Sequence, residues 1–247
     1  MPQAVIRNYR DADLYVGHES AIIWAILTRA DGEGDSPPHA CLQHMSGFAR
    51  HSLQGHKNSD YHQHEGAEQF YYVLTGSGEV LIGDQRYPVS EGSVTYFPPE
   101  TPHQFFAEDT ESGCEHLIIT CPVERSGSEP RVLNWRDASP SAGVHGGAVT
   151  WNLLESIDEE EPSTERPCLL GFYYLARQAL LRGKASDYHK HDDKEQVYYI
   201  LEGTGSIMTG SDVHPIAEGD TVYLPRGVCH QIINEDCDGW LTYLVIS

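Results

Sequence analysis

The chain is two copies of one unit, laid end to end in a single register. Residues 59–64 read Ser-Asp-Tyr-His-Gln-His, and residues 186–191 read Ser-Asp-Tyr-His-Lys-His, so that position 62 recurs at position 189, a shift of 127. The shift holds as far as residue 247, which pairs with residue 120. A repeat this long predicts two duplicated domains rather than a solenoid, with an N-terminal domain over 1–121, a linker over 122–130 and a C-terminal domain over 131–247. The same shift relates further identical pairs: Trp24 and Trp151, Cys41 and Cys168, Arg50 and Arg177, Gly92 and Gly219, Pro98 and Pro225, and His103 and His230.

Within each unit the pattern is typical of short strands. Residues 69–74 are rich in aromatic and β-branched side chains and end at the turn sequence Thr-Gly-Ser-Gly over 75–78. Residues 94–97 (Val-Thr-Tyr-Phe) stop at two prolines, and the second unit repeats both features at 196–201 and 221–224. Short strands separated by Gly, Pro and Asp predict an all-β sandwich or barrel in each unit.

Charge and composition narrow the class of partner. The chain has 16 basic and 37 acidic residues and a net charge of −21, which repels nucleic acid and anionic membranes and favours a small-molecule ligand. Residues 1–13 lack the apolar segment of a signal peptide, and the apolar run at 21–27 is far shorter than the ~20 residues of a membrane helix. None of the six cysteines forms a Cys-x-x-Cys pair, so we expect free thiols and a cytoplasmic location.

Two identically spaced histidine triplets carry the chemistry. His62 and His64 are two residues apart, so on a strand both imidazoles face the same side, and His103 follows a proline-rich turn. Imidazole-rich sites suit Fe, Ni, Zn, Co, Mn or Cu, and the ligands alone do not choose among them. We therefore predict a divalent transition metal in each unit, held in the second by His189, His191 and His230.

These motifs resemble those of the cupin family, and the duplication resembles a bicupin. The first family motif places a Gly some residues before His-x-His and a second Gly after it, and the second motif reads Gly, Pro-x-Gly, His and Asn. The second unit matches the second motif in full. The first unit has Glu100 where that motif has the Gly of Pro-x-Gly, and Ala107 where it has the Asn. The resemblance implies two tandem double-stranded β-helix (jelly-roll) barrels. The matching residues of the second unit are Gly219, Pro225, Gly227, His230 and Asn234.

The fourth metal ligand is ambiguous. In the family a Glu usually stands seven positions before the motif Gly, and this spacing leads to Gln69 and Gln196 rather than to the preceding Glu68 and Glu195. Neighbouring strand residues face opposite sides, so only one of each pair can reach the metal unless a bulge intervenes. We favour the glutamines; in the alternative, the glutamates bind the metal and the glutamines pack or hydrogen-bond. An uncharged ligand set leaves the ion with its full charge, which favours Lewis-acid chemistry.

Other repeated residues have two interpretations each. Arg50 and Arg177 either hold a substrate carboxylate from inside the barrels or are surface charges. Tyr71 and Tyr198 have the strand parity of the glutamines and are acid–base candidates or core residues. The two glutamates are the carboxylates closest in sequence to the histidine pairs, and they are candidate bases if they point inward.

Together these features predict a metal-dependent bicupin enzyme that acts on a small oxygenated metabolite. The expected chemistry is that of an isomerase, cyclase or lyase, through an enolate-like state. A dioxygenase with the same ligands and a non-catalytic small-molecule or metal-binding barrel are the alternatives. Because bicupins often assemble further, the resemblance also implies a possible homo-oligomer.

Overall fold

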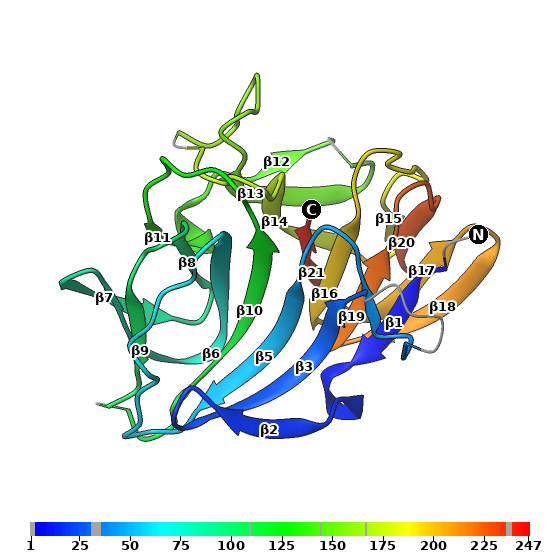
Figure 1. Ribbon diagram of the computed structural model, residues 1–247. Helices are drawn as coiled ribbons and strands as arrows, with labels where there is room; N and C mark the ends of the chain where they lie inside the picture. The colour runs from blue at the N-terminus through cyan, green and yellow to red at the C-terminus, as the bar shows by residue number, and fades with distance from the viewer. Residues whose placement is uncertain (1–2, 31–35, 109, 144, 166, 236–238) are drawn as a thin grey trace.

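The chain folds into two β-barrels side by side, as Figure 1 shows. The computed structural model describes residues 3–30, 36–108, 110–143, 145–165, 167–235 and 239–247. Within them the helical elements are two short 3₁₀ turns, η1 (Tyr9–Asp11) and η2 (Trp135–Asp137). The predicted all-β fold with two tandem barrels is thereby confirmed.

The N-terminal barrel is organised around one long strand, β6 (Ala67–Ile82). Its first half pairs with β8 (Ser93–Phe97) and β10 (Cys114–Pro122), and its second half pairs with β7 (Gln85–Ser90) and β9 (His103–Phe106). β6 thus links the two walls of the barrel and passes directly beside the predicted metal ligands. The remaining strands are β2 (Leu14–Gly17), β3 (Ala21–Arg29), β4 (Ala40–Leu42) and β5 (Gly47–Leu53).

The C-terminal barrel repeats this plan with its walls as separate sheets. One sheet contains β16, β19 and β21, and the four-stranded sheet has the order β15-β20-β17-β18. The strands are β12 (Ser141–Ala142), β13 (Ala148–Glu155), β14 (Tyr174–Leu181), β15 (Lys184–Ala185), β16 (Gln196–Glu202), β17 (Thr204–Thr209), β18 (Asp212–Ala217), β19 (Asp220–Leu224), β20 (His230–Asn234) and β21 (Trp240–Ile246).

The first strand of each unit pairs with the other unit. β1 (Val5–Asn8) pairs antiparallel with β19 of the C-terminal barrel, and β11 (Arg131–Asn134) pairs antiparallel with β8 of the N-terminal barrel. In Figure 1 the blue β1 lies among the orange strands of the second barrel. The predicted domain limits at 121 and 131 follow the order of the repeats along the chain, whereas in space each barrel includes one strand from the other segment.

The exchanged segments fit closely against a glycine of the second family motif. The Trp135 amide donates to the Gly92 carbonyl (3.1 Å), and a Cβ on Gly92 would lie 2.2 Å from the Trp135 ring. In the other barrel the Tyr9 amide donates to the Gly219 carbonyl (3.3 Å). Both glycines have positive φ, +81° and +86°, a conformation that other residues rarely adopt. Glycine at these two positions therefore admits the exchanged segment.

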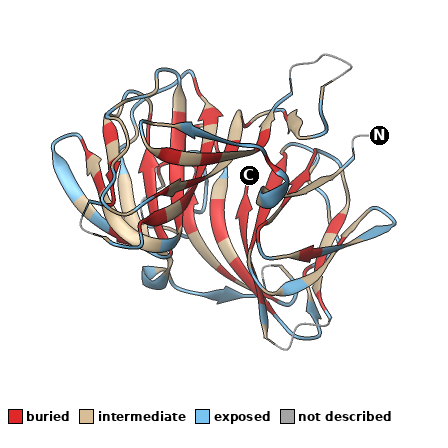
Figure 2. Cartoon of the chain, turned by 90° about the horizontal axis from the view of Figure 1, so that it is seen from below, coloured by how far each residue is buried: buried red, intermediate tan, exposed pale blue. Residues whose placement is uncertain are grey.

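One core cluster extends across both barrels and is packed with residues of β5, β6, β10, β14, β16 and β21. Figure 2 shows the buried residues concentrated along the central strands. The barrel interiors form two further clusters. The five described cysteines carry no disulfide, and Cys237 lies outside the described residues. A search of the described segments finds no helix with the length and apolar character needed to cross a membrane.

Candidate metal centres

The structure brings the first histidine triplet together in the N-terminal barrel. His62 and His103 form an antiparallel bridge, in which the His62 amide donates to the His103 carbonyl (3.1 Å) and the His103 amide donates back (2.8 Å). One ring nitrogen from each of His62, His64 and His103 lies within 4.8 Å of the others. Backbone hydrogen bonds thus join the segments of His62 and His103, about 40 residues apart in sequence, at the place where a shared ion would bind.

Hydrogen bonds at the outer ring nitrogens orient these imidazoles. His103 Nδ1 lies 2.9 Å from the Thr101 carbonyl, and His62 Nδ1 lies 3.2 Å from the Asp60 carbonyl. A backbone acceptor at Nδ1 fixes the proton there and leaves the lone pair on Nε2, as in metal-bound histidines. The Nε2 atoms of His62 and His64 are buried and have no hydrogen-bond partner. Buried polar atoms are otherwise nearly always paired, so these nitrogens fit a metal ion.

The second triplet has almost the same geometry. The bridge between His189 and His230 has N···O distances of 3.1 and 2.8 Å. Nδ1 of His189 lies 3.0 Å from the Asp187 carbonyl, and Nδ1 of His230 lies 2.9 Å from the Val228 carbonyl. The Nε2 atoms of His191 and His230 are buried without partners. This site therefore fits a metal ion as well.

Burial lowers the pKa of the most deeply buried ligand in each triad. Desolvation lowers the pKa of His103 to about 3 and the pKa of His230 to about 4. These two imidazoles, one in each triad, are therefore neutral at physiological pH, which is the form that binds a metal.

The two glutamines differ in what their amide groups contact. Gln69 Nε2 donates to Thr120 Oγ1 (2.9 Å), while its Oε1 is buried and has no partner. Gln196 Nε2 donates to the Tyr174 hydroxyl, and its Oε1 accepts from the Tyr198 hydroxyl at 3.4 Å. An amide oxygen beside the triad thus remains available as a fourth ligand in the N-terminal barrel, whereas in the C-terminal barrel both ends of the amide are engaged.

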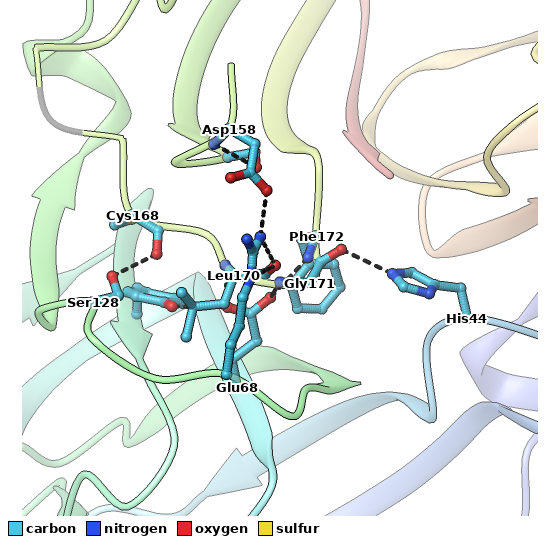
Figure 3. Close-up of polar contacts among 11 residues, drawn as sticks. His44, Glu68, Ser128, Asp158, Cys168, Leu170, Gly171 and Phe172 are labelled. Carbon is cyan, nitrogen blue, oxygen red and sulfur yellow. Dashed lines mark hydrogen bonds and ion pairs between the residues drawn. The ribbon is translucent and has the colours of Figure 1, made fainter. Parts of the chain in front are cut away.

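The two glutamates point away from the triads and join the barrels to one another. Glu68 accepts hydrogen bonds from the backbone amides of residues 170, 171 and 172 at 2.8, 2.6 and 2.7 Å and from the Tyr96 hydroxyl at 2.8 Å, as Figure 3 shows in part. Glu195 accepts from the amides of residues 43, 44 and 45 at 2.8–2.9 Å and from the Tyr223 hydroxyl at 3.0 Å. Their oxygens are occupied by the other barrel. This corrects the expectation that they act as bases, or alternatively as ligands, at the metal.

The tyrosines differ between the barrels. The Tyr71 hydroxyl lies 3.2 Å from His103 Nε2, so it is next to the expected metal position. Desolvation raises the pKa of Tyr71, so its phenol stays protonated. The Tyr198 hydroxyl is instead bonded to Gln196. Of the two predicted acid–base candidates, only Tyr71 has its hydroxyl against a triad nitrogen.

The two arginines lie between the barrels rather than inside them. Arg50 Nη1 donates to the Tyr199 hydroxyl (3.2 Å), and Arg177 Nη1 donates to the Tyr72 hydroxyl (2.8 Å), so each reaches across to the other domain. Both line an interdomain cavity of about 250 Å³. Arg50 also pairs with Glu115. Neither of the two predicted alternatives, substrate binding inside the barrel or a free surface charge, describes this placement.

Sequence reasoning missed three histidines of the N-terminal barrel. His18, His51 and His116 line a small cavity together with His62 and Tyr71. His18 Nδ1 also lies 2.8 Å from Asp60 Oδ1, which in turn is 3.4 Å from His62 Nδ1. For two of them the signal was a difference between the repeats, because the shift of 127 pairs positions 51 and 116 with a glutamine and a tyrosine, whereas His18 pairs with another histidine, His145. Attention to identical pairs conceals such differences.

Each barrel thus has a cluster of three histidines that could hold a metal ion. The family model described as "Cupin domain" matches residues 50–120 and 176–246, which together make up more than half of the chain. The chain belongs to the cupin family, and its two matches confirm the tandem arrangement.

Solved structures share the two-barrel fold at low sequence identity. A putative glyoxylate-induced protein from Pseudomonas aeruginosa aligns over 99% of this chain and 87% of its own, with a TM-score of 0.76 and 15% identity. A variant of oxalate decarboxylase from Bacillus subtilis aligns over 98% of this chain and 76% of its own, with a TM-score of 0.72 and 16% identity. These similarities show the fold.

Similar curated sequences cover a smaller part of the chain. An oxalate-binding protein from Thermotoga maritima is 39% identical over 61 residues, which are 24% of this chain and 50% of that protein. An uncharacterized protein from Methanocaldococcus jannaschii is 37% identical over 60 residues, which are 24% of this chain and 48% of that protein. The chain thus matches about half the length of each.

Proposed function

We propose that the protein is a metal-dependent bicupin enzyme that acts on a small oxygenated acid by isomerisation, elimination or cyclisation through an enolate-like state. The observation that carries the proposal is the pair of buried Nε2 atoms without hydrogen-bond partners in each barrel, at His62 and His64 in one and at His191 and His230 in the other.

The ligand set of the N-terminal barrel is uncharged. It consists of His62, His64 and His103, with the Gln69 amide oxygen beside them as the fourth donor. A divalent ion held there would supply Lewis-acid polarisation of a carbonyl or carboxylate oxygen. Since no ligand carboxylate offsets the ion's charge, the site favours an anionic substrate.

The chain's own groups provide orientation and a proton. Thr120 holds the Gln69 amide nitrogen, so the amide oxygen remains directed away from that bond. Tyr71 is buried and protonated, and its hydroxyl can donate a hydrogen bond to an oxygen that develops negative charge. Phe97 stacks on His103 at 4.1 Å between ring centroids and shields it from water.

Metal loading and anaerobic turnover test the proposal. The metal-free protein is loaded in turn with Mn, Fe, Co, Ni, Cu and Zn, and a panel of oxo-acids and sugar acids is assayed without oxygen. Oxalate and glyoxylate are included as binding probes because the fold neighbours are named for oxalate decarboxylation and glyoxylate induction, and turnover is sought with the acids of the panel that have an enolisable C–H. Mn comes first because B. subtilis oxalate decarboxylase is described with Mn(II) centres. His64→Ala should lose one metal and His56→Ala, at an exposed histidine, should lose none. Failure to bind any of these ions would refute the proposal.

A second candidate is a barrel that binds a small acid without converting it. The local similarity to an oxalate-binding protein and the narrow N-terminal cavity favour this alternative. Stable binding of oxalate with no turnover of the panel, in air or without oxygen, would establish it. Oxygen consumption on addition of an acid would instead identify the dioxygenase alternative.

A further inference from the structure

The two barrels have matching cages but different interiors. His51 and His116 in the N-terminal barrel are replaced by Gln178 and Tyr243 in the C-terminal barrel. All four side chains are buried, with exposed fractions of 5% or less. The difference therefore lies inside the barrels, where a ligand of the metal would extend.

Two buried glutamines of the C-terminal barrel are hydrogen-bonded to tyrosines. The Tyr243 hydroxyl donates to Gln178 Oε1 (2.9 Å), and the Tyr198 hydroxyl donates to the amide oxygen of Gln196. Tyr174 accepts from the other end of the same amide, so a third phenol lies beside Gln196. We expect an incoming ligand to compete with these hydrogen bonds.

In the N-terminal barrel the corresponding positions are open or unpaired. Gly47 stands where the second unit has Tyr174, and a Cβ built there would meet only Thr120 Oγ1 within 4 Å, at 4.0 Å. His116 Nδ1 is buried without a partner, and the His116 ring lies 5.6 Å from that of His51 between centroids. These two rings line a cavity of about 10 Å³, which holds one water-sized group.

We propose that the N-terminal barrel is the ligand-binding and catalytic one, where His51 and His116 bind an oxygen of a small carboxylic acid held at the metal, and that the C-terminal metal site is closed and structural. The proposal deepens the function proposed above and rests on it. The size of the cavity limits the far end of the ligand to a single oxygen-sized group, as in a two- or three-carbon acid.

The charges of this chamber agree with such a ligand. Desolvation lowers the pKa of His51 to about 2 and the pKa of His116 to about 3, so both rings are neutral. A neutral imidazole can donate one N–H to an anion without the cost of burying a second cation. Apolar residues Leu53, Phe105 and Ile118 complete the wall and keep bulk water away from the bond.

Single-site cobalt spectroscopy tests the assignment without relying on turnover. His191→Ala removes the C-terminal site and His64→Ala removes the N-terminal site, so each variant retains one Co²⁺ whose visible spectrum reports on one barrel. Oxalate is the titrated probe. We expect the spectrum of His191→Ala to change on addition of oxalate and that of His64→Ala to remain constant.

Exchanging the interiors makes the test specific to the two histidines. In the His191→Ala background, His51→Gln with His116→Tyr should retain cobalt. It should weaken oxalate binding about tenfold or more, because the anion loses the hydrogen bonds that the two imidazoles donate. His116→Phe, which keeps the ring packing, covers the case in which the double variant does not fold and should show the same direction. In the His64→Ala background, Tyr243→Phe is the matched control and should leave the cobalt spectrum insensitive to oxalate.

The outcomes separate the two proposals. A response confined to the His64→Ala variant, no response in either variant, or an unchanged affinity after substitution of His116 would overturn the assignment of the N-terminal barrel. Absence of cobalt from both variants and from the unaltered chain would refute the proposed metal-dependent function itself.

Discussion

Replacing Glu68 by Gln should destabilise the protein because it breaks the attachment between the two barrels. The carboxylate is fully buried and accepts four hydrogen bonds, two at each oxygen. Gln has nearly the same shape, but whichever way its amide is turned, the NH₂ group faces two donors and can accept from neither. Packing is preserved, so the substitution isolates the polar contribution.

The magnitude follows from the number of bonds lost. A hydrogen bond to a charged group contributes about 1.5–3 kcal/mol, so two lost bonds amount to about 3–6 kcal/mol. Relief from burying a charge offsets a part of this. We expect a net loss of about 3–5 kcal/mol, which for a chain of this size lowers the Tm by about 6–20 °C.

Equilibrium urea unfolding and thermal unfolding of the metal-free protein measure the loss. Glu65→Gln is the matched control, since Glu65 is exposed three residues away, and it should alter stability by less than about 0.5 kcal/mol. Hydrogen exchange should show faster exchange of the amides of residues 170–172 in the Glu68 variant. Unchanged stability together with lost turnover would refute the reasoning, because a proton-transfer base would behave in that way and an attachment would not.

Three further results are expected. His64→Ala and His191→Ala should each lose one metal per chain by elemental analysis, and loss of both metals from either variant would contradict independent cages. In the metal-free folded protein the pKa values of His51 and His116 are about 2 and about 3, against an ordinary 6.5. Between these values and pH 6.5 the unfolded chain binds protons at both histidines and the folded chain does not. Their contribution to the free energy of unfolding is therefore full above pH 6.5 and is lost toward pH 3. His116→Phe should reduce this slope by up to about 1.4 kcal/mol per pH unit in urea titrations, and an unchanged slope would contradict it. Arg50→Ala should lower stability by about 1–3 kcal/mol with unchanged metal content and oxalate affinity, whereas a tenfold weaker affinity would return Arg50 to the binding site.

Local sequence rules were sufficient to predict the two histidine triads, but they did not predict which residues pack around them. The His-x-His spacing and strand alternation place both histidines on one face, and the same alternation puts Gln69 inside and its neighbour Glu68 outside. Alternation does not say what covers the outer face. Here it is the backbone of the other barrel, which turns an outward carboxylate into a buried acceptor.

The strand exchange could not be read from the repeat for a related reason. β1 and β11 occupy equivalent positions in the two units, so each carries the pattern that suits either barrel. Which sheet a strand joins is decided by the path of the chain between the barrels and by close contacts such as that of Trp135 with Gly92. In a duplicated sequence the first strand of each unit is compatible with pairing in its own barrel or in the other one, and tertiary packing decides which pairing forms.

Identical ligand sets do not by themselves imply two active sites. Each cage joins segments far apart in sequence, so a bound metal stabilises its barrel whether or not a substrate can enter. That contribution gives a reason for a closed site to keep all of its histidines. In the assignment proposed above, whether a site is open to a ligand depends instead on residues around the histidines, here Gly47 against Tyr174 and His116 against Tyr243. In a duplicated metalloprotein, the positions where the repeats differ around the metal are therefore the ones that distinguish a catalytic site from a structural one.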